Sequence, residues 1–320
     1  AVLYPQQSLN TLITGPQGTG KSFLAMLMYR FAVETGTILP DAPFHTAVCA
    51  GHDDSEPAFF EQLFGADGQG GHYAAASRGV LLIDNIHLLS APGRSVVLEH
   101  IVKKDAEEAT GAKSAPLVII TCDGAHIAAA DFRKNMPVTI ELPSLAERPL
   151  EERKSLIQNF LTLEAARAKR VIAINAELMR CLLLYDTDIN LARLKYDIKI
   201  GCANAYVRER ANAPAPLNLY LGDFDNTVRK GFLKYPARRD EVERIIPSDY
   251  TYRFSEHTFE MTAIDRDKSK DNSLYHMIYN RASQLAVQGI AEHDIGLLLV
   301  AELEPLFTAY QNELTSMVLN

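Results

Sequence analysis

Residues 1–145 alternate short apolar runs with amphipathic stretches, the pattern of parallel strands joined by crossover helices. The apolar runs are rich in Val, Ile, Leu or Thr and cover residues 11–14, 46–50, 80–83, 117–121 and 138–142. Strands connected in this way form a parallel sheet that helices cover on both faces. The pattern therefore predicts a doubly wound α/β core with five strands.

A helix is predicted after the first strand and the loop that follows it. Leu24, Leu27, Met28 and Phe31 recur at the i, i+3, i+4 and i+7 spacing of one helix face, and Gly36 supplies a stop. We expect this face to pack on the sheet.

The strand pattern stops near residue 146. Three helical stretches follow, with breaks near residues 170–175 and 186–190, and they predict a small helical lid. Pro and Ala interrupt the helices at 211–216, a charged run covers 265–272, and apolar positions within 274–285 and 295–307 mark two further helices. We expect three parts: an α/β core at 1–145, a helical lid at 146–212, and a linker with a mostly helical region at 213–320.

Composition narrows the class of protein. No apolar run in the 320 residues approaches the length of a membrane span, so no membrane segment is expected. The chain begins at Ala1 with neither Met nor a secretory signal, which we interpret as a segment cut from a longer protein. The net charge of −8 opposes binding to nucleic-acid phosphates, so any DNA contact is expected in a domain outside this segment.

The four cysteines lack the close spacing of zinc ligands or of a disulfide framework: Cys49, Cys122, Cys181 and Cys202. Buried, reduced thiols in a cytoplasmic protein are the expectation.

Residues 15–22 match the phosphate-loop pattern Gly-x-x-x-x-Gly-Lys-Ser/Thr, and the match lies between a predicted strand and a predicted helix. Glycines allow backbone N–H groups to surround phosphates, and the lysine reaches the β and γ phosphates. The residues predicted to bind the nucleotide here are Gly15, Pro16, Gln17, Gly18, Thr19, Gly20, Lys21 and Ser22. An ordinary Gly-rich turn is the alternative, but the strand, the Lys-Ser pair and the helix together favour ATP with Mg²⁺.

Such a site needs an acidic residue at the end of a neighbouring buried strand to hold the metal and its water shell. Asp84 directly follows the apolar run 80–83, so Ser22 and Asp84 are the predicted Mg²⁺ ligands. The alternative for Asp84 is a helix cap or turn residue after a core strand.

Asn85 occupies the position at which ATPases of this general build commonly carry a Glu that polarises the attacking water. An amide cannot act as a general base. Asn85 therefore predicts slow or absent hydrolysis, unless Asp54 or Glu56 takes over that role.

Thr121 ends the fourth apolar run and would lie beside the γ-phosphate if this run neighbours the one that leads to Asp84. It is a candidate polar sensor, and a strand that simply runs into a turn at Asp123 and Gly124 is an equally good interpretation. His87 is expected to be a packed or exposed residue rather than a catalyst.

Taken together, these motifs resemble the AAA+ ATPase modules of sigma-54-dependent transcriptional activators. Within them, the chain is similar to the levanase-regulator type, which carries phosphotransferase-system regulation domains. The resemblance covers nearly the whole chain and rests on stretches such as Met28-Tyr-Arg-Phe-Ala32, Gln62-Leu-Phe-Gly65, Asp84-Asn-Ile-His87 and Leu142-Pro-Ser-Leu-Ala-Glu-Arg-Pro-Leu-Glu-Glu-Arg153.

The resemblance implies a homo-oligomeric ring that holds ATP between subunits, with an arginine finger supplied by the neighbouring subunit. It also implies sigma-54 RNA polymerase as a partner, and phosphocarrier proteins of the phosphotransferase system as partners of domains outside this segment.

This chain departs from the family pattern at three places. The signature loop Gly-Ala-Phe-Thr-Gly-Ala, which engages sigma-54, is absent, because only residues 66–79 separate the 62–65 stretch from the third strand. In the finger region Arg133 is the candidate, with Lys134 in place of a second arginine. The sensor arginine of the lid is expected within 190–194, where Ala192 holds the usual position and Arg193 lies one place away.

Three catalytic positions are thus altered, at Asn85, in the finger region and in the sensor stretch of the lid, while the phosphate loop is intact. This combination predicts a module that keeps nucleotide binding and relaxes turnover. The favoured function is the ATP-binding AAA+ module of a bacterial, sugar-responsive transcriptional regulator with weakened hydrolysis. The missing signature loop argues against contact with sigma-54. The alternative is a fully active ATPase that remodels the sigma-54 promoter complex. A small-molecule kinase fits the phosphate loop alone and leaves the remaining motifs unexplained.

Overall fold

The computed structural model describes residues 9–49, 56–66, 70–109, 115–124, 128–209, 216–248, 250–256, 259–263, 281–282, 285, 295 and 298–299. The chain divides into two compact units. Unit 1 consists of Ala1–Arg148 and Thr187–Lys195, and unit 2 of Pro149–Asp186 and Tyr196–Asn320. Each unit contains a sheet of its own.

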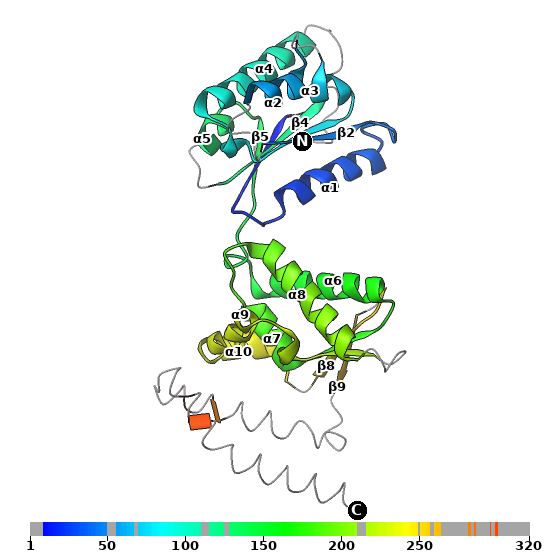
Figure 1. Ribbon diagram of the computed structural model, residues 1–320, viewed down its shortest axis with the longest axis vertical. Coiled ribbons are helices and arrows are strands. Elements are labelled where there is room, and N and C mark those ends of the chain that lie inside the picture. Colours follow the sequence, from blue (N-terminus) through cyan, green and yellow to red (C-terminus); the bar gives the residue numbers. More distant parts are fainter. Residues whose placement is uncertain are drawn as a thin grey trace, which may run out of the picture. The chain divides into compact units, whose positions relative to one another are not determined.

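Unit 1 is built on a parallel sheet with the strand order β2-β3-β4-β1-β5 (Figure 1). Its strands are β1 (Thr11–Thr14), β2 (Phe44–Val48), β3 (Val80–Asp84), β4 (Leu117–Cys122) and β5 (Val138–Glu141). The doubly wound α/β core with five strands, predicted from the sequence, is confirmed. Strand β2 begins two residues earlier than predicted, because the pairing of Phe44 with Val80 extends the ladder.

Helices cover both faces of this sheet. One face carries α1 (Lys21–Glu34), and the other carries α2 (Glu56–Phe64), α3 (Gly71–Ala75), α4 (Ala91–Ala109) and α5 (Ala128–Arg133), as Figure 1 shows. A short 3-10 helix, Ile86–Leu88, joins β3 to α4. The central strands are apolar on both sides because both sides are buried.

The face of α1 that packs on the sheet differs from the predicted one. Leu27 and Phe31 are 41% and 48% exposed, whereas Ala25, Met28 and Ala32 are buried. Small side chains at 25 and 32 let the helix approach the sheet closely, so the larger apolar residues are displaced to the outer side. The predicted helix is confirmed, but its predicted core face is wrong at Leu27 and Phe31.

Unit 2 combines helices with a mixed sheet. Its helices are α6 (Leu150–Ala168), α7 (Ala176–Leu184), α8 (Asn190–Arg208, whose first residues belong to unit 1), α9 (Asn226–Arg229) and α10 (Arg239–Ile245), with 3-10 turns at Leu221–Asp223, Lys230–Lys234 and Pro236–Arg238. The sheet has the order β7-β6-β8-β9 and consists of β6 (Ile172–Asn175), β7 (Leu217–Leu219), β8 (Tyr250–Phe254) and β9 (Phe259–Ala263).

The helical stretches predicted after residue 146 are confirmed as α6, α7 and α8. The sheet of unit 2 was not predicted, since β6 is only four residues long and lies in what the sequence marks as a break between helices. Asn175 ends this strand and starts α7, where its side chain accepts the N–H of Leu178 at 2.9 Å. Most of the two helices predicted within 274–285 and 295–307 lies outside the described residues.

All four cysteines are buried and none forms a disulfide. Burial raises the pKa of the Cys122 thiol to about 11 and those of Cys49 and Cys202 to about 12. The pKa of Cys181 is raised as well, for the same reason.

Candidate nucleotide-binding site

The phosphate loop connects β1 to α1 and requires glycine at two positions. Gly20 caps the helix in a left-handed conformation, with φ of 97°, which residues with a Cβ rarely adopt. Gly18 also has a positive φ, of 76°, and a Cβ at this position would overlap with the carbonyl oxygen of Ile189. The two glycines therefore allow the loop to turn tightly and to lie against residues 187–195.

Lys21 is buried, with its ammonium group enclosed by the loop. Its Nζ donates to the carbonyl oxygens of Gly15 at 2.8 Å and Pro16 at 3.0 Å. Burial lowers the pKa of Lys21, while the nearby carboxylates of Asp123 and Asp84 oppose that shift. A cation held at this position is suited to bind the phosphates of a nucleotide.

Ser22 and Asp84 lie together at the carboxyl end of the sheet. The Ser22 Oγ donates to Oδ1 and Oδ2 of Asp84 at 2.9 Å each. A hydroxyl and a carboxylate are oxygen ligands, the kind that Mg²⁺ prefers. Among the described residues there is no cluster of three or more His, Cys, Asp or Glu that could hold a metal alone. A single hydroxyl and a single carboxylate fit an ion that keeps waters and phosphate oxygens as its other ligands.

Thr121 stands on β4, the strand beside β3, and its hydroxyl joins this network. It donates to Oδ1 of Asp84 and accepts the backbone N–H of Asn85 at 2.9 Å. Its side chain is buried. These contacts orient the Asp84 carboxylate, and they bring the predicted site residues Ser22, Asp84 and Thr121 into one group.

Asn85 adopts a left-handed conformation with φ of 62°. Asn tolerates this region better than most residues with a Cβ. Glu56 is one candidate for the general base that would replace it, and both of its carboxylate oxygens form hydrogen bonds with Ser90. Oε1 accepts the N–H of Ser90 at 2.6 Å and Oε2 accepts its hydroxyl at 2.7 Å, directly before α4. The role of Glu56 as a base stays a prediction. Asp54, the other candidate, lies outside the described residues.

The next turn of chain holds His87 near the same edge of the sheet. Its Nδ1 accepts the N–H of Asp123 at 3.2 Å, so this ring nitrogen has a structural partner. The expectation of a packed residue agrees with this contact.

Arg133 ends α5 and pairs with Glu141 at the end of β5. The Nη2–Oε2 distance is 3.4 Å, and the two side chains are 42% and 69% exposed. An exposed ion pair of this kind is weak, so another anion can replace Glu141 as the partner of Arg133. The assignment of Arg133 as an arginine finger stays a prediction.

Residues 187–195 contribute the start of α8 to unit 1 and lie on the phosphate loop. The N–H of Ala192 donates to the Gly18 carbonyl at 3.1 Å. Arg193, the predicted cofactor contact, follows it in the same helical turn. The role of Arg193 in nucleotide contact stays a prediction. The sequence pattern offers no reason to select Asn190, whose amide also bonds to the loop.

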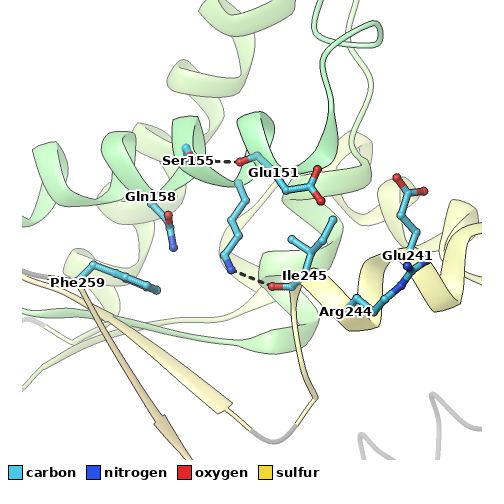
Figure 2. Close-up of a pocket in the computed structure, with 8 residues that line it drawn as sticks. Glu151, Ser155, Gln158, Glu241, Arg244, Ile245 and Phe259 are labelled. Atoms are coloured by element: carbon cyan, nitrogen blue, oxygen red, sulfur yellow. Dashed lines mark hydrogen bonds between the residues drawn. The ribbon is translucent and has the colours of Figure 1, made fainter.

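Unit 2 has an open hollow of about 660 Å³, shown in Figure 2. It is lined by α6, α10 and β9, through Glu151, Lys154, Ser155, Gln158, Glu241, Arg244, Ile245 and Phe259. The Lys154 ammonium already donates to the Ile245 carbonyl at 2.8 Å, and Glu241 pairs with Arg238. None of the predicted site residues lies there, and its lining carries two carboxylates, Glu151 and Glu241, beside two cations, Lys154 and Arg244.

Comparison with known proteins adds independent information. Residues 2–134 match the model of the sigma-54 interaction domain. The chain is 26% identical to the transcriptional regulatory protein LevR of Bacillus subtilis (strain 168) over 94% of this chain, and 33% identical to the transcriptional regulatory protein DagR of Salmonella typhimurium over 64% of this chain. It covers 34% of LevR and 24% of DagR, so both relatives are much longer.

A crystal structure of NtrX from Brucella abortus has the same fold. It superimposes with a TM-score of 0.50 over 93% of this chain and 65% of that chain, at 17% sequence identity. Among the residues that the structure describes, no helix has the length and apolar character needed to cross a membrane.

Proposed function

Since this chain is a AAA+ module of the sigma-54 activator type, similar to those of LevR and DagR, we propose that it binds ATP with Mg²⁺ and hydrolyses it weakly. The observation that carries the proposal is the group formed by Lys21 inside the phosphate loop and Ser22 bonded to Asp84. Lys21 and Ser22 directly follow the glycine loop, and Asp84 at the end of β3 is bonded to Ser22, at the carboxyl end of a parallel sheet, where such folds bind phosphates.

The roles of the side chains follow from their chemistry. Lys21 would hold the β and γ phosphates, and Ser22 and Asp84 would hold Mg²⁺, which when bound neutralises phosphate charge. Thr121 keeps the Asp84 carboxylate oriented. Asn85 offers no proton acceptor for an attacking water, and this supports slow turnover.

The wider function that we propose is a nucleotide-responsive module in a bacterial, sugar-responsive transcriptional regulator located in the cytoplasm. The similarity to LevR supports this role. Ring formation and an arginine finger from Arg133 are part of the proposal, as are phosphotransferase-system partners and DNA contacts through other parts of the longer protein. The absence of the Gly-Ala-Phe-Thr-Gly-Ala loop supports a function without remodelling of the sigma-54 promoter complex.

The test combines binding and turnover. A non-hydrolysable ATP analogue is titrated into the wild type and into Lys21→Ala, and we expect the variant to bind about tenfold to a hundredfold more weakly, since it loses a charged phosphate contact. Steady-state hydrolysis should stay low across a protein concentration series. Turnover that rises with protein concentration would instead establish a working ring and favour the active remodelling ATPase. Absence of binding by the wild type would end the proposal.

A further inference from the structure

Asn190 is a buried polar residue of unit 1 whose side-chain amide forms hydrogen bonds through both its oxygen and its nitrogen. It is 5% exposed and begins α8 in a left-handed conformation, with φ of 52°. The side-chain oxygen accepts the N–H of Leu145 at 2.7 Å, and the side-chain nitrogen donates to the Gln17 carbonyl at 2.8 Å. The same nitrogen lies at a longer 3.5 Å from the carbonyl oxygen of Asp188.

A second contact holds the next carbonyl of the phosphate loop. The N–H of Ala192 donates to the Gly18 carbonyl at 3.1 Å, and Gly18 approaches Ile189 so closely that a side chain would not fit. Two consecutive loop carbonyls, those of Gln17 and Gly18, are therefore turned toward residues 187–195.

The orientation of these carbonyls decides where the loop N–H groups point. In a trans peptide the C=O and the N–H lie on opposite sides of the chain. When the carbonyls of Gln17 and Gly18 face Asn190 and Ala192, the N–H groups of Gly18 and Thr19 face the other way. Backbone N–H groups that converge in such a loop are what binds phosphate.

We propose that Asn190 is a positioning residue for nucleotide binding: its side-chain N–H holds the Gln17–Gly18 peptide so that the following N–H groups are aligned for phosphate. The inference rests on the proposed nucleotide binding. It assigns the two ends of the amide different roles, because the bond to Leu145 holds the chain together and the bond to Gln17 sets the loop.

Asn190→Asp separates the two roles. The carboxylate can still accept the N–H of Leu145, but it replaces the donor with an oxygen that faces the Gln17 carbonyl. Affinity of the folded variant for a non-hydrolysable ATP analogue should fall about tenfold to a hundredfold, because the loop N–H groups lose their alignment. The melting temperature without nucleotide should fall as well, since a buried carboxylate faces the Gln17 carbonyl, so the affinity is the measurement that decides. A purely structural role would lower the melting temperature and leave the affinity of the folded protein unchanged.

Asn204→Asp is the matched control. Asn204 lies on the same helix, and its side-chain nitrogen donates to the Asp223 carbonyl at 2.8 Å, within unit 2. The same chemical change there should leave ATP affinity as in the wild type. If Asn190→Asp does not fold, Asn190→Ser replaces it, because serine is neutral and too short to reach Gln17. An affinity for the analogue within about threefold of the wild-type value, measured on the folded Asn190 variant, would overturn the inference. Failure of the wild type to bind would instead overturn the proposed function.

Discussion

At the scale of single residues, the chemistry of the site depends on a backbone conformation as much as on side-chain type. Asn85 combines a left-handed backbone with the position next to Asp84. In Asn85→Glu we expect turnover to rise by about 10²- to 10⁴-fold, the usual contribution of a general base. Stability should fall by about 1 kcal/mol, because Glu is strained in this conformation. Steady-state kinetics and thermal unfolding measure the two effects.

Asn85→Gln is the control for that substitution. It has the length of Glu and the same backbone strain, but it carries no base. Equal turnover in the Glu and Gln variants would show that the missing base at position 85 is not what limits hydrolysis.

Glu56 provides a second prediction at this scale. Its carboxylate accepts two hydrogen bonds from Ser90 at the start of α4, so Glu56→Gln should reduce stability by about 1 kcal/mol and leave nucleotide affinity unchanged. Chemical denaturation and a binding titration would test this. If the variant lost residual turnover without losing stability, Glu56 would have to be reassigned as the base.

The sequence identified most of the residues that the structure brings together, because Gly, Lys, Ser and Asp in the phosphate-loop pattern have few other uses at that spacing. It left two interpretations of Thr121, and only the pairing of β4 with β3 places its hydroxyl on Asp84. The role of Asn190 could not be derived, because an Asn at a helix start looks like an ordinary cap and its partner Gln17 is distant in sequence.

At the scale of elements, α1 shows how an apolar pattern can indicate a helix and still misplace its face. Met28 is 9% exposed and Leu27 is 41% exposed. We expect Met28→Ala to cost about 2–4 kcal/mol through a cavity against the sheet, and Leu27→Ala to stay within about 0.5 kcal/mol. Unfolding in denaturant compares the two variants directly. Similar losses for both would restore the core face predicted from the sequence.

The exposed apolar positions explain why that face was misread. Phe23, Leu27 and Phe31 follow one another at four-residue spacing, which is as regular as the buried set of Ala25, Met28 and Ala32. Periodicity alone does not distinguish the two sides when the buried side consists of small residues. Strand β6 was missed for a related reason, since four residues between two helices carry little pattern of their own.

At the scale of the whole molecule, the chain forms two units that each contain a sheet of their own. A ligand that binds only the folded phosphate loop should stabilise unit 1 by about 2.7 kcal/mol at a hundredfold excess over its Kd. Calorimetry should therefore show two unfolding transitions, and the ATP analogue should raise the midpoint temperature of one more than that of the other.

Variants assign the two transitions. Ile172→Ala creates a cavity in the core of unit 2 and should lower the midpoint temperature of the transition that the nucleotide does not shift. Lys21→Ala should reduce the nucleotide shift, because it binds the analogue more weakly. If calorimetry shows a single transition and the nucleotide raises its midpoint temperature, the two units unfold cooperatively.

The burial of all four cysteines has a practical consequence for spectroscopy. Maleimide dyes react with accessible thiolates, and these thiols are both inaccessible and protonated at neutral pH. A cysteine introduced on the surface, for example by Ser155→Cys on α6, would then be the one site that takes up a dye in the native protein. Fluorescent reporters could be attached one at a time to the natural chain without first removing its own cysteines.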